Sequence, residues 1–251
     1  WRLKGFQHFI RVFRSSSTQR KLQQLSGQLR TLIATEEEAF QERGSQLTSF
    51  RDIEIYKQRI GLLKDIEWII RKEILENIAK IKEIGGLTQS LDEEITRIPE
   101  STVKELRSIN AVFNSMDRRL ETRGRDSLGF SIMLTFKDLQ AYNAFREKPS
   151  PSLESEFLQR LNIKDLGNLS ISVKASYERE GKEDPSRPVT VTFVYKTAKL
   201  IGKLGDNVAA LKKDIITDKI LQQIIRQEIV NSTRIIHTRW ASAGVISIEN
   251  C

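Results

Sequence analysis

The segment LGFSIMLTF, residues 128–136, decides the fold, because here the sequence changes from a helical to a β-strand pattern. Three further strand candidates follow it: LSISVKASY at 169–177, VTVTFVYK at 189–196 and STRIIHTRW at 232–240. We interpret residues 146–156 as a loop, and 178–188 as a long hairpin loop between two strands. A helical pattern returns at about 206–229, so the sequence predicts an α+β fold.

The part of the chain before the strands is helical in pattern. Its apolar residues recur every three or four positions, as in Leu22, Leu25, Leu29 and Leu32 and again from Ile53 to Ile81. Gly85 and Gly86 are expected to end the second of these helices. After the break at Pro99, Ser101 is a candidate N-cap for a further helix. We expect an antiparallel helical hairpin, coiled-coil-like, whose apolar stripes are buried against other helices.

These patterns divide the chain into two predicted domains. Residues 1–100 form the helical hairpin, and residues 101–251 form the α+β domain. Within the second domain, residues 146–188 are interpreted as an elaboration made of loops and strands.

Composition limits the classes of function. The chain has one cysteine and two histidines, so we expect no disulfide and no metal site, and we infer no cofactor. A net charge of +8 suggests nucleic acid as a partner, but outside residues 1–14 the basic residues alternate with acidic ones. No apolar run approaches the ~20 residues that span a membrane. We therefore expect neither nucleic acid nor a membrane as a partner, and we expect the protein to be cytoplasmic. We expect residues 1–14 to form a helix that packs on something outside this chain.

Three ordered segments carry a resemblance to a known family. The first segment, at 118–129, leads from a helix into a strand and reads RRLETRGRDSLG. The second, at 195–213, leads from a strand into a helix and reads YKTAKLIGKLGDNVAALKK. The third, at 237–250, follows another strand and reads HTRWASAGVISIEN. Together they resemble the class II glutamine amidotransferase domain of glucosamine–fructose-6-phosphate aminotransferase (isomerizing). The resemblance implies a partial αββα sandwich of the N-terminal-nucleophile type, with the helical hairpin as an insertion.

The resemblance also implies a chemistry. A terminal cysteine hydrolyses glutamine with its own α-amine as the base, and the ammonia passes to a sugar-phosphate isomerase domain that follows in the same chain, for glucosamine 6-phosphate synthesis. No cysteine of this chain matches that nucleophile, because Cys251 stands at the alanine of the family's NAHP segment. The catalytic cysteine is therefore expected upstream of residue 1, and these 251 residues alone are expected to be inactive.

The matched positions imply roles for eight residues. Arg239 would pair with the α-carboxylate of glutamine, Trp240 would belong to the loop that closes over it, and Ser242 would offer a hydroxyl. Residues expected to support the pocket are Arg123, Asp126, His237, Thr238 and Gly244. The chain departs from the family at Ala243, where histidine is common, and at Arg125, where tyrosine is usual.

Alternatives to the enzyme stay open. One is a non-catalytic helical scaffold or interaction protein whose amidotransferase-like domain is degenerate. Another is a helical protein that binds nucleic acid or a membrane surface through residues 1–14. Another amidotransferase with the same kind of nucleophile is a further alternative. The HTRW segment resembles that class less closely than it resembles the sugar-phosphate type. The sequence does not decide whether the protein forms a homo-oligomer.

Overall fold

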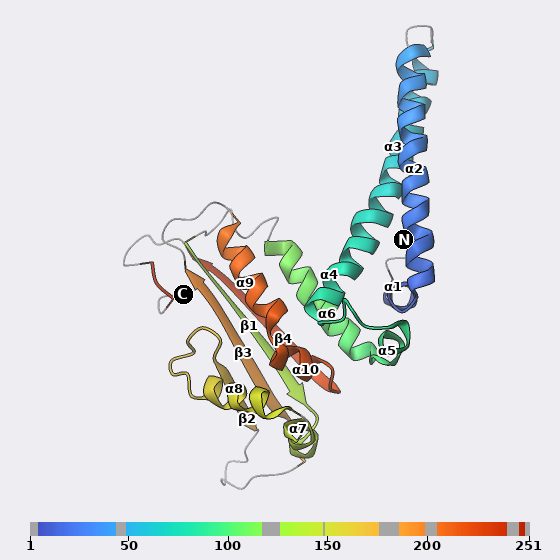
Figure 1. Cartoon of the computed structure of the whole chain (residues 1–251). Coiled ribbons are helices and arrows are strands. Elements are labelled where there is room, and N and C mark those ends of the chain that lie inside the picture. The colour runs from blue at the N-terminus through green and yellow to red at the C-terminus, as the bar shows by residue number, and fades with distance from the viewer. Residues whose placement is uncertain are drawn as a thin grey trace. The chain divides into compact units, whose positions relative to one another are not determined.

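The computed structural model describes residues 5–43, 49–116, 126–147, 149–175, 186–198, 205–239 and 246–248. It is a mixed α+β structure, 64% helical with one four-stranded antiparallel sheet, so the predicted fold class is confirmed at this level. The chain divides into two compact units, one of Trp1–Lys80 with Ser90–Arg97 and one of Ile81–Gln89 with Ile98–Cys251 (Figure 1). No helix among the described residues is long and apolar enough to cross a membrane.

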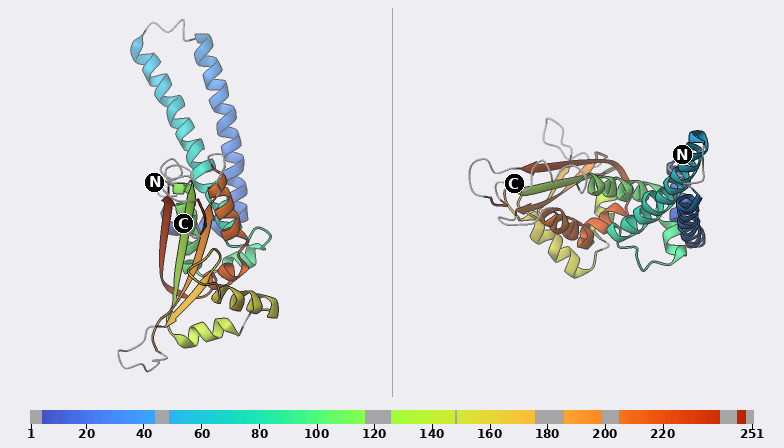
Figure 2. Two further views of the ribbon diagram at one scale, coloured as in Figure 1. Left: turned by 90° about the vertical axis from the view of Figure 1, so that its left-hand side faces the viewer. Right: turned by 90° about the horizontal axis from the view of Figure 1, so that it is seen from above.

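The first unit is built of helices. Helix α1 (Phe6–Phe13) precedes α2 (Ser16–Arg43), and α2 lies along α3 (Phe50–Trp68) as an antiparallel hairpin (Figures 1 and 2). A π-helical segment, η2 (Ile69–Glu76), and then α4 (Asn77–Ile84) continue α3, and α5 (Asp92–Arg97) completes the unit. The boundary between the two units falls within α4. The spacing of the isoleucines predicts a continuous helix here and does not indicate the π-helical turns.

Helix α1 is packed inside the chain and not on something outside it, so that expectation was wrong. Phe9, Ile10 and Phe13 are buried, and α1 contacts α2. The side-chain amide of Gln19 on α2 donates hydrogen bonds to the carbonyls of Val12 and Phe13, at 2.8 and 2.9 Å. These bonds satisfy carbonyl groups at the end of α1 that have no partner within the helix.

The seam between α2 and α3 differs from the prediction. Ile33 and Ile60 are buried there, and so are the polar Ser26 and Glu67. Leu25 and Leu32, which belong to the leucine stripe expected to be buried, are exposed. Leu22 and Leu29, the other two residues of that stripe, are half-buried. Ser26 Oγ donates to Glu67 Oε1 at 2.9 Å, and this bond satisfies two polar side chains in the seam.

The second unit begins where α4 ends. Gly86 follows that helix with a φ of +63°, which is the left-handed conformation that glycine adopts at helix C-termini, as predicted. Helix α6 (Glu100–Ser115) starts directly after Pro99, so Pro99 is its N-cap and the assignment of Ser101 was wrong. The φ of Pro99 is −55°, close to the value at which the proline ring fixes it. Proline also has no N–H to donate, and it costs little here because the first N–H groups of a helix have no partner within the helix.

All four predicted strands form, and they make one antiparallel sheet with the order β2-β3-β1-β4. The strands are β1 (Ser127–Phe136), β2 (Ile171–Ala175), β3 (Val189–Ala198) and β4 (Ile229–Arg239). Strands β2 and β3 are adjacent and antiparallel, as expected for the two arms of a hairpin. The predicted loop at 178–188 lies partly outside the described residues.

Four further helices interrupt the strands. They are α7 (Leu139–Arg146), α8 (Pro151–Leu161), α9 (Asp206–Thr217) and α10 (Lys219–Ile225). Helix α8 occupies residues that were interpreted as loop; Pro151, which suggested a loop, is instead at the first helical turn, where proline is favoured. The single helix expected at 206–229 is two helices, because Asp218 ends α9 and caps α10 through its bond from the Leu221 N–H.

Helices cover one face of the sheet. On β1, alternate residues from Leu128 to Phe136 are buried, and on β3 the residues from Val189 to Tyr195 on the same face are buried with them. Helices α7, α8 and α9 contact the strands there, and α10 packs against α6 and α8 (Figure 2). Glu105 of α6 forms an ion pair with Arg234 of β4. The other face carries mainly half-buried or exposed side chains, including Ser131, Met133 and Thr192. The described sheet is therefore covered on one side.

Candidate functional site

Three strands bring the predicted site residues to one end of the sheet. Ser127, the first residue of β1, has Ala198 of β3 as its partner on one side and Arg239 of β4 on the other. The N–H of Asp126 donates to the carbonyl of Arg239 at 3.1 Å. The antiparallel pairing thus places Asp126 beside Arg239, although 112 positions separate them in the chain.

Helix α9 starts at the same end of the sheet. Its second residue, Asn207, is buried, and its Oδ1 accepts a hydrogen bond from Thr197 Oγ1 at 3.1 Å. Asn207 Nδ2 in turn donates to the carbonyl of Asp126 at 3.5 Å. One amide therefore joins the start of β1, the end of β3 and the start of α9. Its burial requires these bonds, since an unpaired amide in this position would be costly.

The described parts of the three segments that carried the family resemblance meet at this end of the sheet. We name it the 126–239 edge and define it by Asp126, Thr197, Asn207 and Arg239. Sequence reasoning singled out Asp126 and Arg239 but missed Thr197 and Asn207. Both missed residues lie in the segment at 195–213, which had been quoted as a whole. A polar residue directly after a helix-starting glycine and aspartate was the signal that could have identified Asn207.

The other predicted residues of this region fall on different faces of β4. His237 is opposite Gly129 and Arg239 is opposite Ser127, so both lie on the face that the helices leave open. Thr238 is opposite Leu128 and faces the helices. His237 is exposed, whereas Asp126, Thr238 and Arg239 are half-buried. Arg123, Trp240, Ser242 and Gly244 lie outside the described residues.

A second polar cluster, which the sequence did not predict, lies under the helices. Arg160 of α8 forms an ion pair with Asp218 at 2.8 Å, and the hydroxyl of Tyr195 donates to the same Asp218 oxygen at 2.7 Å. Burial and the charge of Asp218 raise the pKa of Tyr195 well above its ordinary value, so the phenol stays protonated. Burial alone would lower the pKa of Arg160, but the carboxylate of Asp218 raises it.

The buried cluster is structural. Arg160 Nε also donates to the carbonyl of Leu169 at 2.6 Å, and its guanidinium lies 5.6 Å from the centre of the Phe193 ring. The other oxygen of Asp218 caps α10. Each charge is therefore paired and hydrogen-bonded, which is the condition under which charges are tolerated in a protein interior. The cluster connects α8, β3 and α10, and its three side chains are almost fully buried.

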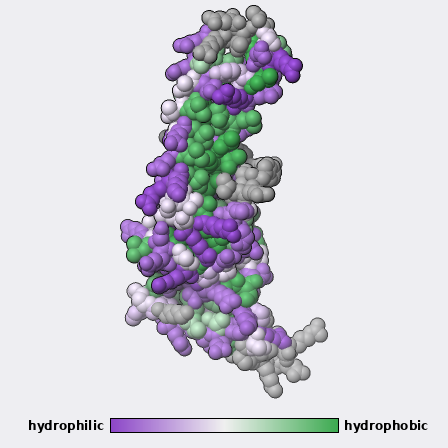
Figure 3. Space-filling view, turned by 90° about the vertical axis from the view of Figure 1, so that its right-hand side faces the viewer, coloured by the Kyte–Doolittle hydropathy of each residue, from purple (hydrophilic) through white to green (hydrophobic). Residues whose placement is uncertain are grey.

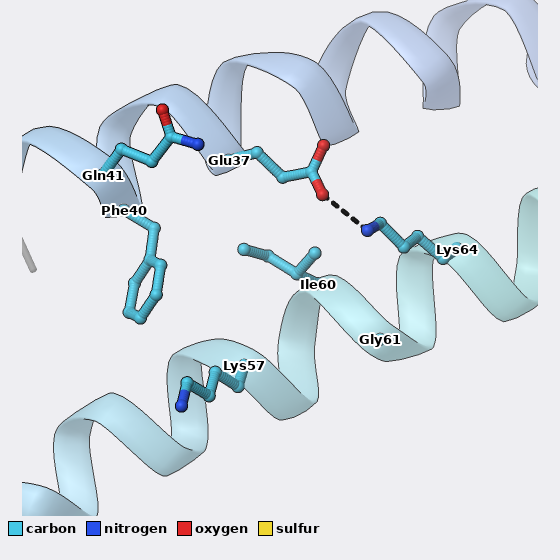
Figure 4. Close-up of a pocket in the computed structure, with 7 residues that line it drawn as sticks. All are labelled: Glu37, Phe40, Gln41, Lys57, Ile60, Gly61 and Lys64. Carbon is cyan, nitrogen blue, oxygen red and sulfur yellow. Dashed lines mark ion pairs between the residues drawn. The ribbon is translucent and has the colours of Figure 1, made fainter.

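Two adjoining grooves run along one side of the α2–α3 hairpin. One has a volume of about 440 Å³ and is lined by Phe40, Ile60 and Lys57, with an ion pair between Glu37 and Lys64 across it at 2.5 Å (Figure 4). The next, of about 420 Å³, runs along Ala34 and Trp68. Figure 4 shows the side chains of Glu37 and Lys64 reaching toward each other between the two helices. Both grooves are open to solvent, and their charges are largely neutralised by each other.

Within residues 5–43, 49–116, 126–147 and the later described segments, no three His, Cys, Asp or Glu side chains come together as metal ligands would. The chain matches no protein-family model, no curated protein and no solved structure.

Proposed function

We propose that the 126–239 edge is part of a glutamine site, and that this chain supplies part of the glutaminase portion of an enzyme like glucosamine-6-phosphate synthase. The observation that carries the proposal is the meeting of three distant segments at one edge through Asp126, Asn207 and Arg239. The three segments lie far apart in the sequence, and the pairing of β1 with β3 and β4 brings them together, as the proposed site requires.

The proposed chemistry assigns Arg239 to the α-carboxylate of glutamine. A guanidinium offers two parallel N–H donors to a carboxylate, and it stays charged at all relevant pH values. Trp240 and Ser242, the next residues along, are proposed to cover the substrate and to offer a hydroxyl. Asn207 is proposed to position Asp126 through its hydrogen bond to the Asp126 carbonyl and not to touch the substrate itself. The nucleophile is proposed to be a cysteine outside these 251 residues, and ammonia would leave toward a sugar-phosphate isomerase domain in the cytoplasm.

The fold proposed for this enzyme is the αββα sandwich. Support comes from the helices that cover one face of the sheet while His237 and Arg239 lie on the other face. In the proposal the open face of the described sheet packs on a second sheet. The α2–α3 hairpin is an insertion that comes before the described sheet in the sequence.

The experiment is steady-state glutaminase kinetics of the complete protein with Arg239→Ala. Loss of a charge-assisted pair is expected to raise the KM for glutamine by roughly 10- to 100-fold. The variant should also lose the preference for glutamine over glutaminamide, in which the α-carboxylate is replaced by an amide. Thr233→Ala, an exposed residue on the same face of β4, is the control and should change neither value. An unchanged KM in Arg239→Ala would remove the carboxylate assignment.

A second candidate function is that of a non-catalytic interaction protein. It is favoured by the aliphatic side chains that the α2–α3 hairpin exposes, because contiguous apolar surface on a folded protein marks a site of association. The two candidates are distinguished by the kinetics above: a complete protein without glutaminase activity would favour the interaction protein.

A further inference from the structure

Five large aliphatic side chains are exposed on the α2–α3 hairpin. The exposed fraction is 41% for both Leu25 and Leu32 on α2, and it is 55% for Ile55, 63% for Leu62 and 48% for Ile66 on α3. We call this set the apolar face. Figure 3 shows hydrophobic surface gathered along the hairpin on the side turned to the viewer.

Helix geometry places these residues on one side of the hairpin. Leu25, Leu32 and Ile66 each come directly before a seam residue, namely Ser26, Ile33 and Glu67. One residue is a rotation of about 100° around a helix, and it has the same sense in both helices. Because the helices are antiparallel, equal rotations from the seam lead to the same side. The residues that directly follow the seam, Ala34, Gly61 and Trp68, line the grooves on the opposite side.

The side of the hairpin that carries the apolar face is large enough for a protein interface. Helix α2 has 28 residues, so at about 1.5 Å per residue it is about 40 Å long. Two helices, each about 10 Å wide with side chains, present a face of roughly 800 Å². That is about the area that each partner buries in an interface of standard size.

The charges of α2 indicate which partner fits. Before Thr35 the helix carries only basic charged residues, and the exposed Lys21, four residues before Leu25, lies on the side of the apolar face. Its last turns contain four glutamates, of which the exposed Glu42, ten residues after Leu32, flanks the apolar face. The apolar leucines lie between these two ends. A helix of this kind is complementary to a second copy of itself running in the opposite direction, because each basic end then meets an acidic end.

We propose that the apolar face binds the same face of a second copy of this chain, head to tail, to form an antiparallel four-helix bundle about a two-fold axis. Such an interface is self-complementary, as two-fold symmetry requires. The inference is independent of glutamine chemistry. A nucleic acid would be repelled by the acidic end of α2, and a membrane surface would favour basic residues along the whole polar side.

The first test is the mass of the 251-residue chain in solution, by light scattering and sedimentation over a concentration series. We expect a dimer whose dissociation constant rises at least about tenfold in Leu62→Glu and in Ile66→Glu. The matched control is Leu158→Glu on α8, a leucine exposed to a similar degree (46%) outside the hairpin, which should leave the dimer unchanged. Helical content by circular dichroism should be the same in all four proteins, since each substituted side chain is exposed. A wild-type chain that stays monomeric at every concentration overturns the proposal.

The second test examines the direction of the partner. Lys21→Glu makes both ends of α2 acidic beside the apolar face, and Glu42→Lys makes both basic. Each variant alone should dimerise at least about tenfold more weakly, through repulsion at both ends. An equimolar mixture of the two should form heterodimers at least as tight as the wild-type dimer. Dimers that persist equally in both variants and gain nothing on mixing overturn the head-to-tail arrangement.

Discussion

The sheet unit buries Phe130, Phe193 and Tyr195 under its helices, whereas the α2–α3 hairpin buries Ser26 and Glu67 between its helices and exposes Leu25 and Leu32. The two regions treat charge in different ways as well. In the sheet unit the Arg160–Asp218 pair is almost fully enclosed, while the Glu37–Lys64 pair of the hairpin is about half exposed. The sheet unit covers its own apolar residues on one face; the hairpin satisfies its polar residues and leaves apolar ones available to a partner.

The largest effect that would sharpen this comparison is expected from Asp218→Ala. The substitution removes the carboxylate that pairs with the buried guanidinium of Arg160 and accepts from the hydroxyl of Tyr195, and it removes the cap of α10. We expect a loss of about 3–5 kcal/mol in the free energy of unfolding, measured by denaturant titration. Lys64→Ala, which breaks the exposed pair of the hairpin, should cost no more than about 0.5 kcal/mol. Equal costs for the two would contradict the contrast between the regions.

The second effect compares two neighbours on α2. Ile33 is 8% exposed in the seam and Leu32 is 41% exposed beside it. Ile33→Ala should lower the stability of the hairpin by about 2 kcal/mol, at the low end of the range for buried aliphatic residues because the seam of two helices is narrow. Leu32→Ala should change it by less than about 0.5 kcal/mol. The measurement is thermal loss of helical circular dichroism in dilute solution, where association does not contribute; the reverse order of the two would mean that the leucine line is the true seam.

These two neighbours also mark how far the sequence could predict the fold. The spacing of the leucines identified α2 as a helix, but it could not select the seam, because the choice of Ser26 and Ile33 over Leu25 and Leu32 depends on a bond to Glu67 from 41 residues away. The strands were predicted well, since alternation records which side of a strand is buried. Helix α8 was missed because Pro151 and its serines are common both in loops and at helix starts.

The candidate site shows the same limit. The letters of three motifs pointed to Asp126 and Arg239, and strand pairing places those two side by side. Asn207 could not be assigned in advance, because its importance comes from contacts with Thr197 and Asp126 that only the folded sheet creates. His237 and Thr238 were predicted together, yet adjacent residues of a strand face opposite ways, so only His237 shares the open face with Arg239.

The smallest effect concerns Glu67. Burial alone would raise its pKa, but hydrogen bonds from Arg71 and Ser26 and the charges of Arg71 and Arg30 lower the pKa below the ordinary value of 4.5. A carboxyl whose pKa is lower in the folded than in the unfolded state adds stability above pH 4.5, and this contribution is lost as the pH falls through the folded pKa. Glu67→Gln keeps the shape without the charge and should cost about 0.5 kcal/mol at neutral pH, because its partners Arg71 and Arg30 are partly exposed and solvent screens their charges. The difference between wild type and variant, measured by thermal unfolding at several pH values, should shrink as the pH falls below 4.5. A difference that stays constant with pH would mean that Glu67 acts in the seam through shape and hydrogen bonding, so that the hairpin, unlike the sheet unit, uses no buried charge for stability.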